Sequence, residues 1–142
     1  MSRGSVELVR QLQPSGIDLV AVLGGERPGP LGLNPSLFDD ELESAFIAPG
    51  LRSDTRHGFE GFVAGWRDWL EAWQRYEIWA EDFIDAGDAV VVFARVNALT
   101  RRDAIPMEHA PAAVWTLRGG IVCRIDFYYE RAAALKAVGL AG

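Results

Sequence analysis

The sequence predicts an α+β domain in which short helices come first and an antiparallel sheet follows. A set of aromatic residues recurs at spacings of three and four in the middle of the chain, which is typical of one face of a helix. Beyond residue 76, apolar and polar residues alternate, as they do in half-buried strands. Gly119 and Gly120 separate two such strands, and a two-glycine connection is a strong signal for a β-hairpin.

The N-terminal third of the chain is expected to contain two short helices. Residues 5–12 form the first, with a serine as the N-cap, and residues 17–23 form the second. Residues 24–35 are rich in glycine and proline and are expected to form an inserted loop. Residues 37–46 are expected to begin as a helical turn and continue as a strand, and the polar residues 50–57 to form a loop.

The clearest helix is expected over residues 59–73. The aromatic residues on its apolar face are Phe59, Phe62, Trp66, Trp69 and Trp73. The strands expected after this helix cover residues 77–84, 89–99, 110–117 and 121–129. A short helix over residues 131–138 closes the domain, and Gly139 stands where a helix C-cap is expected.

The Gly119–Gly120 turn sets the expected register of the last hairpin. One face of that hairpin is then expected to carry three facing pairs, which are Val114 with Ile125, Ala112 with Phe127, and Ala110 with Tyr129. Glu108 has the parity of this face if its strand runs back without a bulge. His109 is expected on the opposite face, in a dimer contact or an exposed position.

Composition excludes several classes of protein. The chain of 142 residues suits a single domain, residues 1–142, and its net charge of −6 disfavours a nucleic-acid partner. A single cysteine and two histidines predict neither a disulfide nor a metal site. No apolar run is long enough to span a membrane, and the first residues do not resemble a signal peptide, so a cytoplasmic protein without a cofactor is expected.

Four stretches of the sequence resemble SnoaL-like proteins of the NTF2-like superfamily, which includes ketosteroid isomerases, polyketide cyclases and limonene epoxide hydrolases. The four stretches are residues 56–61 with the helix that follows, 82–92, 113–122 and 129–135. The resemblance covers roughly residues 37–140. It implies an NTF2-like (cystatin-like) cone, in which a curved antiparallel sheet wraps over helices around a blind apolar pocket. It also implies a homodimer formed through the outer face of the sheet.

The chain departs from two enzymes of that superfamily at their catalytic positions. The two carboxyl groups of ketosteroid isomerase would fall near Ala45 and Ala112, so that mechanism is not expected. The Arg-x-Asp strand of limonene epoxide hydrolase becomes Arg95-Val96-Asn97, with an amide in place of the acid. The second aspartate of that enzyme falls at Phe127, or at Asp126 if the last strand slips by one residue.

Charged residues on the predicted strands are the candidates for catalysis. Arg95 lies in an otherwise apolar strand and is expected to stabilise negative charge in the pocket. The alternative is a surface arginine paired with Glu108 or Glu77. Glu108 or Glu43 is expected to act as the general base, and the alternative for each is a solvated strand residue.

The candidates for substrate binding lie on the same expected face. Asn97 and Tyr129 are expected to orient the substrate, and Trp66, Phe127 and Ile125 to line the pocket. The alternative for the tryptophans of the helix is a purely structural place in the core.

Three functions remain open from the sequence. The first is a SnoaL-like protein that binds a small, apolar, oxygen-bearing molecule and, without a cofactor, transfers a proton in a cyclisation, isomerisation or hydration. The second is a hydrolase similar to limonene epoxide hydrolase. The third is a non-catalytic dimer whose pocket is filled by side chains.

Overall fold

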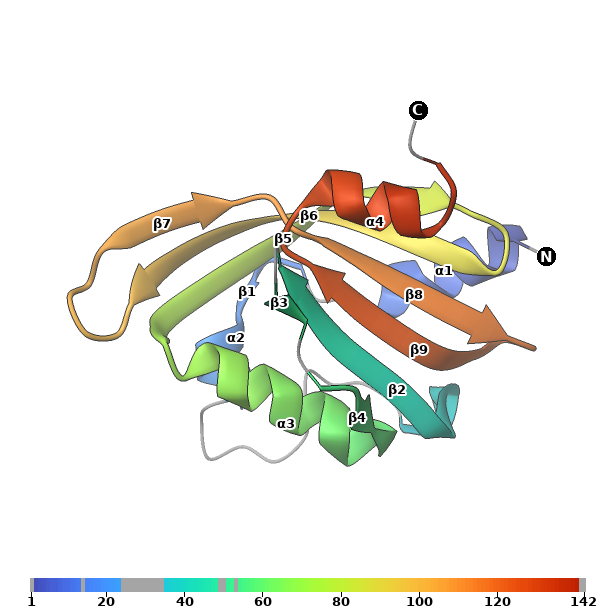
Figure 1. Ribbon diagram of the computed structural model, residues 1–142, viewed down its shortest axis with the longest axis horizontal. Coiled ribbons are helices and arrows are strands. Elements are labelled where there is room, and N and C mark those ends of the chain that lie inside the picture. Colours follow the sequence, from blue (N-terminus) through green and yellow to red (C-terminus); the bar gives the residue numbers. More distant parts are fainter. Residues whose placement is uncertain (1, 14, 24–34, 49–50, 53, 141–142) are drawn as a thin grey trace.

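The computed structural model describes residues 2–13, 15–23, 35–48, 51–52 and 54–140. Its helices are α1 (Ser2–Leu12), α2 (Leu19–Leu23), α3 (Gly58–Leu70) and α4 (Arg131–Ala137), with a 3-10 turn, η1, at Pro35–Leu37. Its strands are β1 (Ile17–Asp18), β2 (Phe38–Ala48), β3 (Leu51–Arg52), β4 (Arg56–His57), β5 (Trp73–Asp85), β6 (Ala89–Thr100), β7 (Pro106–His109), β8 (Ala112–Arg118) and β9 (Ile121–Tyr128). A curved sheet carries α3 on its concave side and α4 on its convex side (Figure 1).

The sheet is mixed rather than purely antiparallel. Its strand order is β1-β5-β6-β8-β9-β2-β3, while β4 pairs with β2 and β7 pairs with β6. All of these pairs are antiparallel except β2 with β9, which run parallel. The expectation of an antiparallel sheet is therefore wrong for this one pair. The parallel pair joins the first long strand to the last and brings Phe46 beside Phe127.

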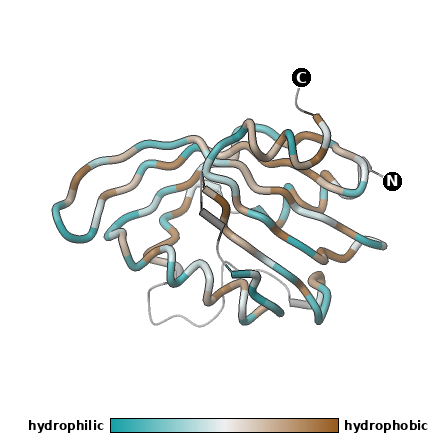
Figure 2. Tube along the Cα trace, viewed as in Figure 1, coloured by the Kyte–Doolittle hydropathy of each residue, from teal (hydrophilic) through white to brown (hydrophobic). Residues whose placement is uncertain are grey.

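Side chains of the central strand β6 alternate between two separate apolar cores. Those on its concave side belong to one core with residues of α1, α2 and α3, and they are Val90, Val92, Ala94, Val96 and Ala98. On its convex side, Ala89 and Val91 pack with Ala134 of α4. Figure 2 shows apolar and polar segments interspersed along the strands.

The N-terminal elements differ from the expected ones. Helix α1 begins before Ser5, the expected N-cap. The segment 17–23 divides into the strand β1 and the short helix α2. Asp18 holds the junction, because its Oδ1 accepts hydrogen bonds from the backbone N–H groups of Val20 and Tyr76, each at 3.0 Å. The segment is thus fixed to β5 instead of forming a single helix.

The middle of the chain confirms one expectation and corrects two. Residues 37–46 do pass from a helical turn, η1, into the strand β2. The expected loop at 50–57 contains the strands β3 and β4. Helix α3 ends at Leu70, and Trp73 belongs to β5, where it pairs with Thr100. Of the expected inserted loop, residues 24–34 lie outside the described residues.

A β-bulge at Cys123 changes the register of the last hairpin. The turn at Gly119–Gly120 pairs Leu117 with Val122 as expected, but Thr116 then pairs with Arg124. Cys123 is therefore an extra residue on β9, and its Sγ lies 3.4 Å from the carbonyl oxygen of Thr116. An extra residue on one strand shifts its pairing by one position. Every later residue of that strand then shares a face with the opposite set of residues on the partner strand.

The changed register decides which face of β8 meets the concave core. Ile125 lies opposite Trp115, and Phe127 lies opposite Ala113, not Ala112. Trp115 and Ala113 belong to the concave core, whereas Ala112 belongs to the convex core under α4. The expected inward face of β8 is therefore its outward face.

Deletion of Cys123 is expected to be tolerated better than deletion of Asp126. Without Cys123, alternation still places Val122 and Ile125 on the concave side, so the variant loses the bulge but keeps both cores. We expect a cooperative thermal transition and a loss of about 0.5–3 kcal/mol in the free energy of unfolding. Deleting Asp126 turns Phe127 outward and is expected to abolish cooperative unfolding. Equal losses in the two variants, measured by circular dichroism, would contradict this role of the bulge.

Candidate functional site

A cavity of about 340 Å³ lies between α3 and the concave face of the sheet. Its volume suits a small organic molecule. The wall is mostly aromatic and aliphatic. Its polar side chains include Gln13, Arg56, Asp68, Tyr76, His109 and Tyr129.

Aromatic rings from three elements form one side of the cavity. Trp66 lies on α3 at the spacing that faces the core, while Phe46 of β2 and Phe127 of β9 are direct neighbours in the parallel strand pair. The Phe46 and Phe127 rings stack with centroids 4.8 Å apart, and Trp66 meets Phe127 edge-on at 4.9 Å. Rings in these geometries attract each other and hold the wall in place.

Tyr76 and His109 meet on the opposite, sheet-lined side. They come from β5 and β7, which flank β6, where Tyr76 pairs with Ala98 and His109 with Val96. The hydroxyl oxygen of Tyr76 lies 3.1 Å from Nε2 of His109. Tyr129 stacks on the imidazole with ring centroids 5.1 Å apart. The register of two strand pairs thus places a phenol and an imidazole in hydrogen-bond contact within an apolar wall.

Burial keeps both members of this pair uncharged at neutral pH. It raises the pKa of Tyr76 far above its ordinary value, so the phenol keeps its proton. Burial also lowers the pKa of His109 from its ordinary 6.5, so the imidazole is neutral. The pair is therefore a neutral hydrogen-bonding unit rather than an ion pair.

The two ring nitrogens of His109 have different surroundings. Nε2 faces the hydroxyl group of Tyr76, which can donate a hydrogen bond to it or accept one from it, depending on the tautomer. Nδ1 is buried and has no hydrogen-bond partner among the described residues. A buried polar atom without a partner costs free energy. Because Nδ1 is closed off from solvent, a ligand oxygen recovers that cost only where neighbouring side chains move to admit it.

The described residues contain no group of three or more histidine, cysteine, aspartate or glutamate side chains placed to bind a metal ion. No helix within the described ranges has the length and apolar character needed to cross a membrane.

Solved structures of known fold match nearly the whole chain. A protein from Jannaschia sp. CCS1, provisionally named a SnoaL-like polyketide cyclase, aligns with a TM-score of 0.69 at 20% identity, over 99% of this chain and 94% of that one. TerC, crystallised with polyporic acid, aligns with a TM-score of 0.63 at 19% identity, over 95% of this chain and 98% of its own. The chain has the NTF2-like fold. The predicted α+β cone is confirmed.

A third similar structure illustrates how little the NTF2-like fold specifies about ligands. It is a hypothetical protein from Catenulispora acidiphila with a ketosteroid isomerase-like fold, in complex with trimethylamine. It aligns with a TM-score of 0.56 at 21% identity, over 85% of this chain and 88% of that one. No family model and no curated protein matches the sequence. At these identities the comparisons establish the fold, and a fold alone does not determine a function.

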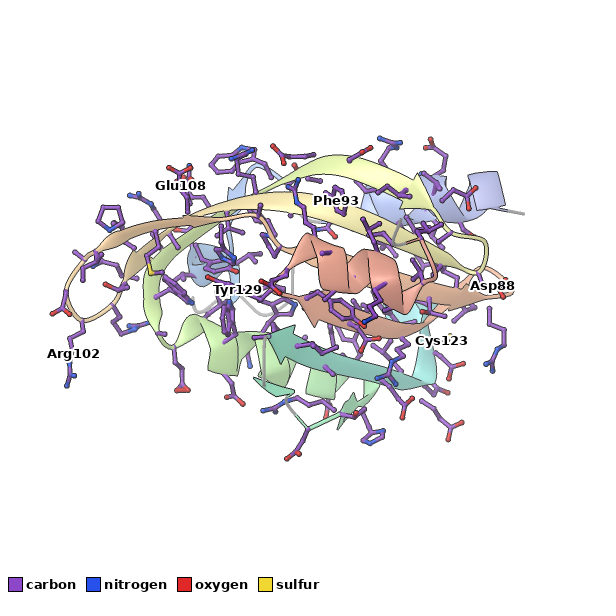
Figure 3. The ribbon with its side chains drawn as sticks, turned by 45° about the horizontal axis from the view of Figure 1, so that its top comes forward. Asp88, Phe93, Arg102, Glu108, Cys123 and Tyr129 are labelled. Carbon is purple, nitrogen blue, oxygen red and sulfur yellow. The ribbon has the colours of Figure 1, made fainter. Side chains whose placement is uncertain are left out.

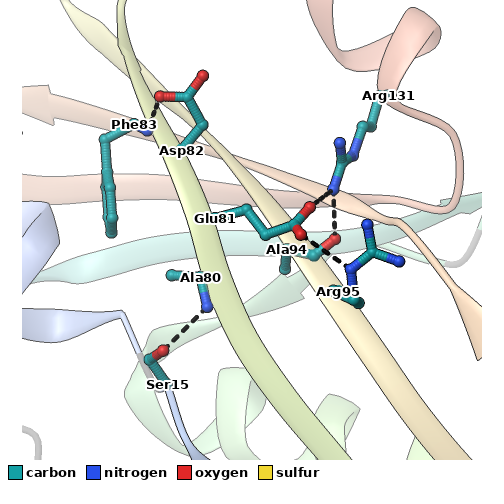
Figure 4. Close-up of polar contacts among 8 residues, drawn as sticks. All are labelled: Ser15, Ala80, Glu81, Asp82, Phe83, Ala94, Arg95 and Arg131. Carbon is teal, nitrogen blue, oxygen red and sulfur yellow. Dashed lines mark hydrogen bonds and ion pairs between the residues drawn. The ribbon is translucent and has the colours of Figure 1, made fainter.

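Arg95 does not point into the NTF2-like cavity, so the expected orientation is wrong. It lies on the convex side of β6, where its Nε donates to Glu81 at 2.8 Å (Figure 4). Glu81 also accepts a hydrogen bond from Arg131, at the start of α4. These hydrogen bonds, first from Arg131 and then from Arg95, lower the pKa of Glu81. Arg95 is therefore a surface arginine whose partner is Glu81 rather than Glu108 or Glu77.

Glu108 and Asn97 also lie on the convex side. They pair with each other across β7 and β6, and Asn97 alternates with the inward residues Val96 and Ala98. Figure 3 shows Glu108 above these strands and Tyr129 below them. Glu108 does share a face of the sheet with Ala112, as expected, but that face is the convex one. His109, expected on the outer face, is the residue that reaches the cavity.

Glu43 is the third expected catalytic residue outside the cavity wall. It shares the convex face of β2 with Ala45, as alternation predicts. Its Oε1 lies 3.1 Å from Nη1 of Arg124, whose Nε in turn donates to Asp126 at 2.8 Å. His57 Nδ1 lies 3.9 Å from its other carboxylate oxygen. Glu43 thus belongs to a charged network on the surface.

The expected substrate-binding residues divide into two groups. Trp66, Phe127 and Tyr129 do line the cavity. Ile125 is fully buried in the concave core beside the cavity, and Asn97 is on the convex side. The bulge at Cys123 turns Trp115 and Ala113 inward, and alternation back along the chain from Ala113 places His109 on the same face. The sequence therefore identifies His109 only when the position of the bulge is known.

The stability of the protein is expected to depend on the protonation of His109. Because burial lowers its pKa in the folded state, the unfolded chain binds this proton more tightly. The contribution of a neutral His109 is complete above about pH 6.5 and is lost as the pH falls below that value. Urea unfolding should therefore show wild type losing more stability than His109→Gln between about pH 7.5 and pH 5. A difference between the two proteins that is constant over this range would contradict the assignment.

Proposed function

We propose that the protein binds a small, largely apolar molecule through a carbonyl or hydroxyl oxygen, and that the Tyr76–His109 pair contacts this oxygen. The observation that supports this most directly is a neutral, hydrogen-bonded pair in the wall of an apolar cavity, with Nδ1 of His109 left without a partner in the described structure. The aromatic wall around Trp66 and Phe127 supplies the apolar contact. Few polar groups in an apolar cavity are typical of sites that orient one functional group of a ligand.

The same geometry supports proton transfer at a carbon next to a carbonyl group. A neutral imidazole N–H near the carbonyl oxygen stabilises the negative charge that develops there as the adjacent C–H bond gives its proton to water. The electron pair of that C–H bond then forms the enolate, and no cofactor enters the step. In the tautomer in which the hydroxyl group of Tyr76 donates to Nε2, the imidazole carries its proton on Nδ1, and this N–H is the donor that the step uses. This reaction class agrees with the proton transfer expected from the sequence but assigns it to different residues.

Two alternative functions are weakened by the positions of side chains. The hydrolase alternative depends on Arg95 and Asn97 facing the substrate, and both residues lie on the convex side. The non-catalytic alternative assumes that side chains fill the pocket, whereas Trp66 and Phe127 surround an open volume of about 340 Å³.

Binding can be tested with 1-naphthol and naphthalene, which differ by one hydroxyl group. Quenching of tryptophan fluorescence reports affinity, since Trp66 and Trp69 line the cavity. We expect wild type to bind 1-naphthol about fivefold to tenfold more tightly than naphthalene, the effect of one hydrogen bond. His109→Phe is expected to remove this preference, while Arg95→Gln on the convex face retains it. Equal affinity of wild type for both compounds would contradict the proposal.

Proton transfer can be tested with 1-tetralone in deuterium oxide. Incorporation of deuterium next to the carbonyl, followed by nuclear magnetic resonance, measures enolate formation directly. Wild type is expected to accelerate the exchange, and His109→Phe to reduce that acceleration by about 10²-fold, as when an oxyanion-stabilising donor is removed. Binding of 1-tetralone without faster exchange would limit the function to ligand binding.

A further inference from the structure

Arg56 and Asp68 form a second polar cluster in the cavity wall, separate from the Tyr76–His109 pair. Arg56 opens the short strand β4, which pairs with β2 and leads directly into α3. Its Nη2 forms a charged hydrogen bond with Oδ2 of Asp68, in the last turn of α3. The cluster therefore joins the strand that leads into α3 to the last turn of that helix.

Two glycines shape α3 to fit the stem of Arg56. Gly61, Gly65 and Asp68 follow one another at spacings of four and three, so they share one face of the helix. A Cβ atom at Gly61 would lie 3.2 Å from Cβ of Arg56, and one at Gly65 would lie 3.2 Å from its Cδ. The missing side chains thus leave a track along which the aliphatic stem of Arg56 lies. Arg56 is held against the helix by packing as well as by charge.

The ion pair leaves much of the Arg56 guanidinium available. A guanidinium has five N–H donors, and the one bond to Asp68 is its only hydrogen bond among the described residues. The side chains of Arg56 and Asp68 are 39% and 59% exposed, so water weakens their attraction. An oxygen of a ligand in the cavity can therefore share this arginine with Asp68.

A series of aromatic rings leads from Arg56 to His109. Gly65, which Arg56 covers, lies against Phe46, since a Cβ atom there would be 3.3 Å from Cε1 of that ring. The Phe46 ring stacks with Trp69 at 5.9 Å, and the Trp69 ring meets that of Tyr76, the partner of His109, edge-on at 6.5 Å. The cavity thus has two polar positions, one cationic and one neutral, with apolar rings leading from one to the other.

We propose that Arg56 determines specificity by selecting ligands that carry a carboxylate in addition to their apolar body. A guanidinium matches the two oxygens of a carboxylate in geometry and charge. Among the described wall residues Arg56 is the one cation, and Asp68 is the one carboxylate that competes for it. This inference rests on the proposed function, because it takes the same cavity as the binding site.

The test compares 2-naphthoate with 2-naphthamide, which have nearly the same shape but differ in charge. Wild type is expected to bind the carboxylate about fivefold to tenfold more tightly than the amide, as for a charge-assisted hydrogen bond partly exposed to water. Arg56→Gln is expected to reduce this ratio to about one. Asp68→Asn removes the competing carboxylate and is expected to raise the ratio above that of wild type. Arg95→Gln, which removes a surface arginine, serves as the matched control and leaves the ratio unchanged.

The outcomes separate this inference from the proposed function. His109→Phe is expected to weaken both naphthalene derivatives without changing their ratio, because His109 does not contact the charged end. Equal affinity of wild type for the two compounds, or a ratio unaffected by both Arg56→Gln and Asp68→Asn, would overturn the role of Arg56. In that case the preference for 1-naphthol over naphthalene still tests the proposed function independently. Failure of all four compounds to bind would overturn both.

Discussion

The inward orientation of β9 is the constraint on which the cavity depends. A strand has two faces, and the extra residue at Cys123 determines which of them meets the inward face of β8. With that residue present, Ile125 supports Trp115 in the concave core and Phe127 reaches the aromatic wall. The parallel pairing with β2 then adds Phe46 beside Phe127. A single bulge therefore links the closing hairpin to the shape of the binding site.

The two faces of the sheet use polar residues in opposite ways. On the convex face, Glu81 and Glu43 are partly exposed and form ion pairs with arginines, which water screens. On the concave face, Tyr76 and His109 are withdrawn from water and remain neutral. A charged side chain costs little free energy where water solvates it and much more where burial removes that water. The chemistry of this site therefore follows from uncharged donors, with Arg56 at the solvent-exposed part of the wall as the exception.

The sequence contains enough information to predict the fold but not the polar site. Helical spacing places Trp66 correctly, because a helix has one apolar face and the face itself identifies the core. Strand alternation separates Glu108 from His109 without showing which of the two faces inward. That choice depends on the bulge at Cys123, and no glycine or other turn residue marks it. Arg56 is harder still to predict, since its position depends on packing against glycines of the following helix.

Helix α4 limits how far the chain can be shortened, because it covers apolar residues of the sheet. It covers an apolar strip on the convex face that includes Val91 and Val114, and Arg131 fastens it to Glu81 and to the carbonyl oxygen of Ala94. The homodimer expected through this face stays a prediction, and the helix occupies part of the surface that it would use. A chain cut before Arg131 would present the strip to solvent, and exposed apolar patches of this kind promote aggregation. The last helix thus protects the solubility of the sheet that it covers.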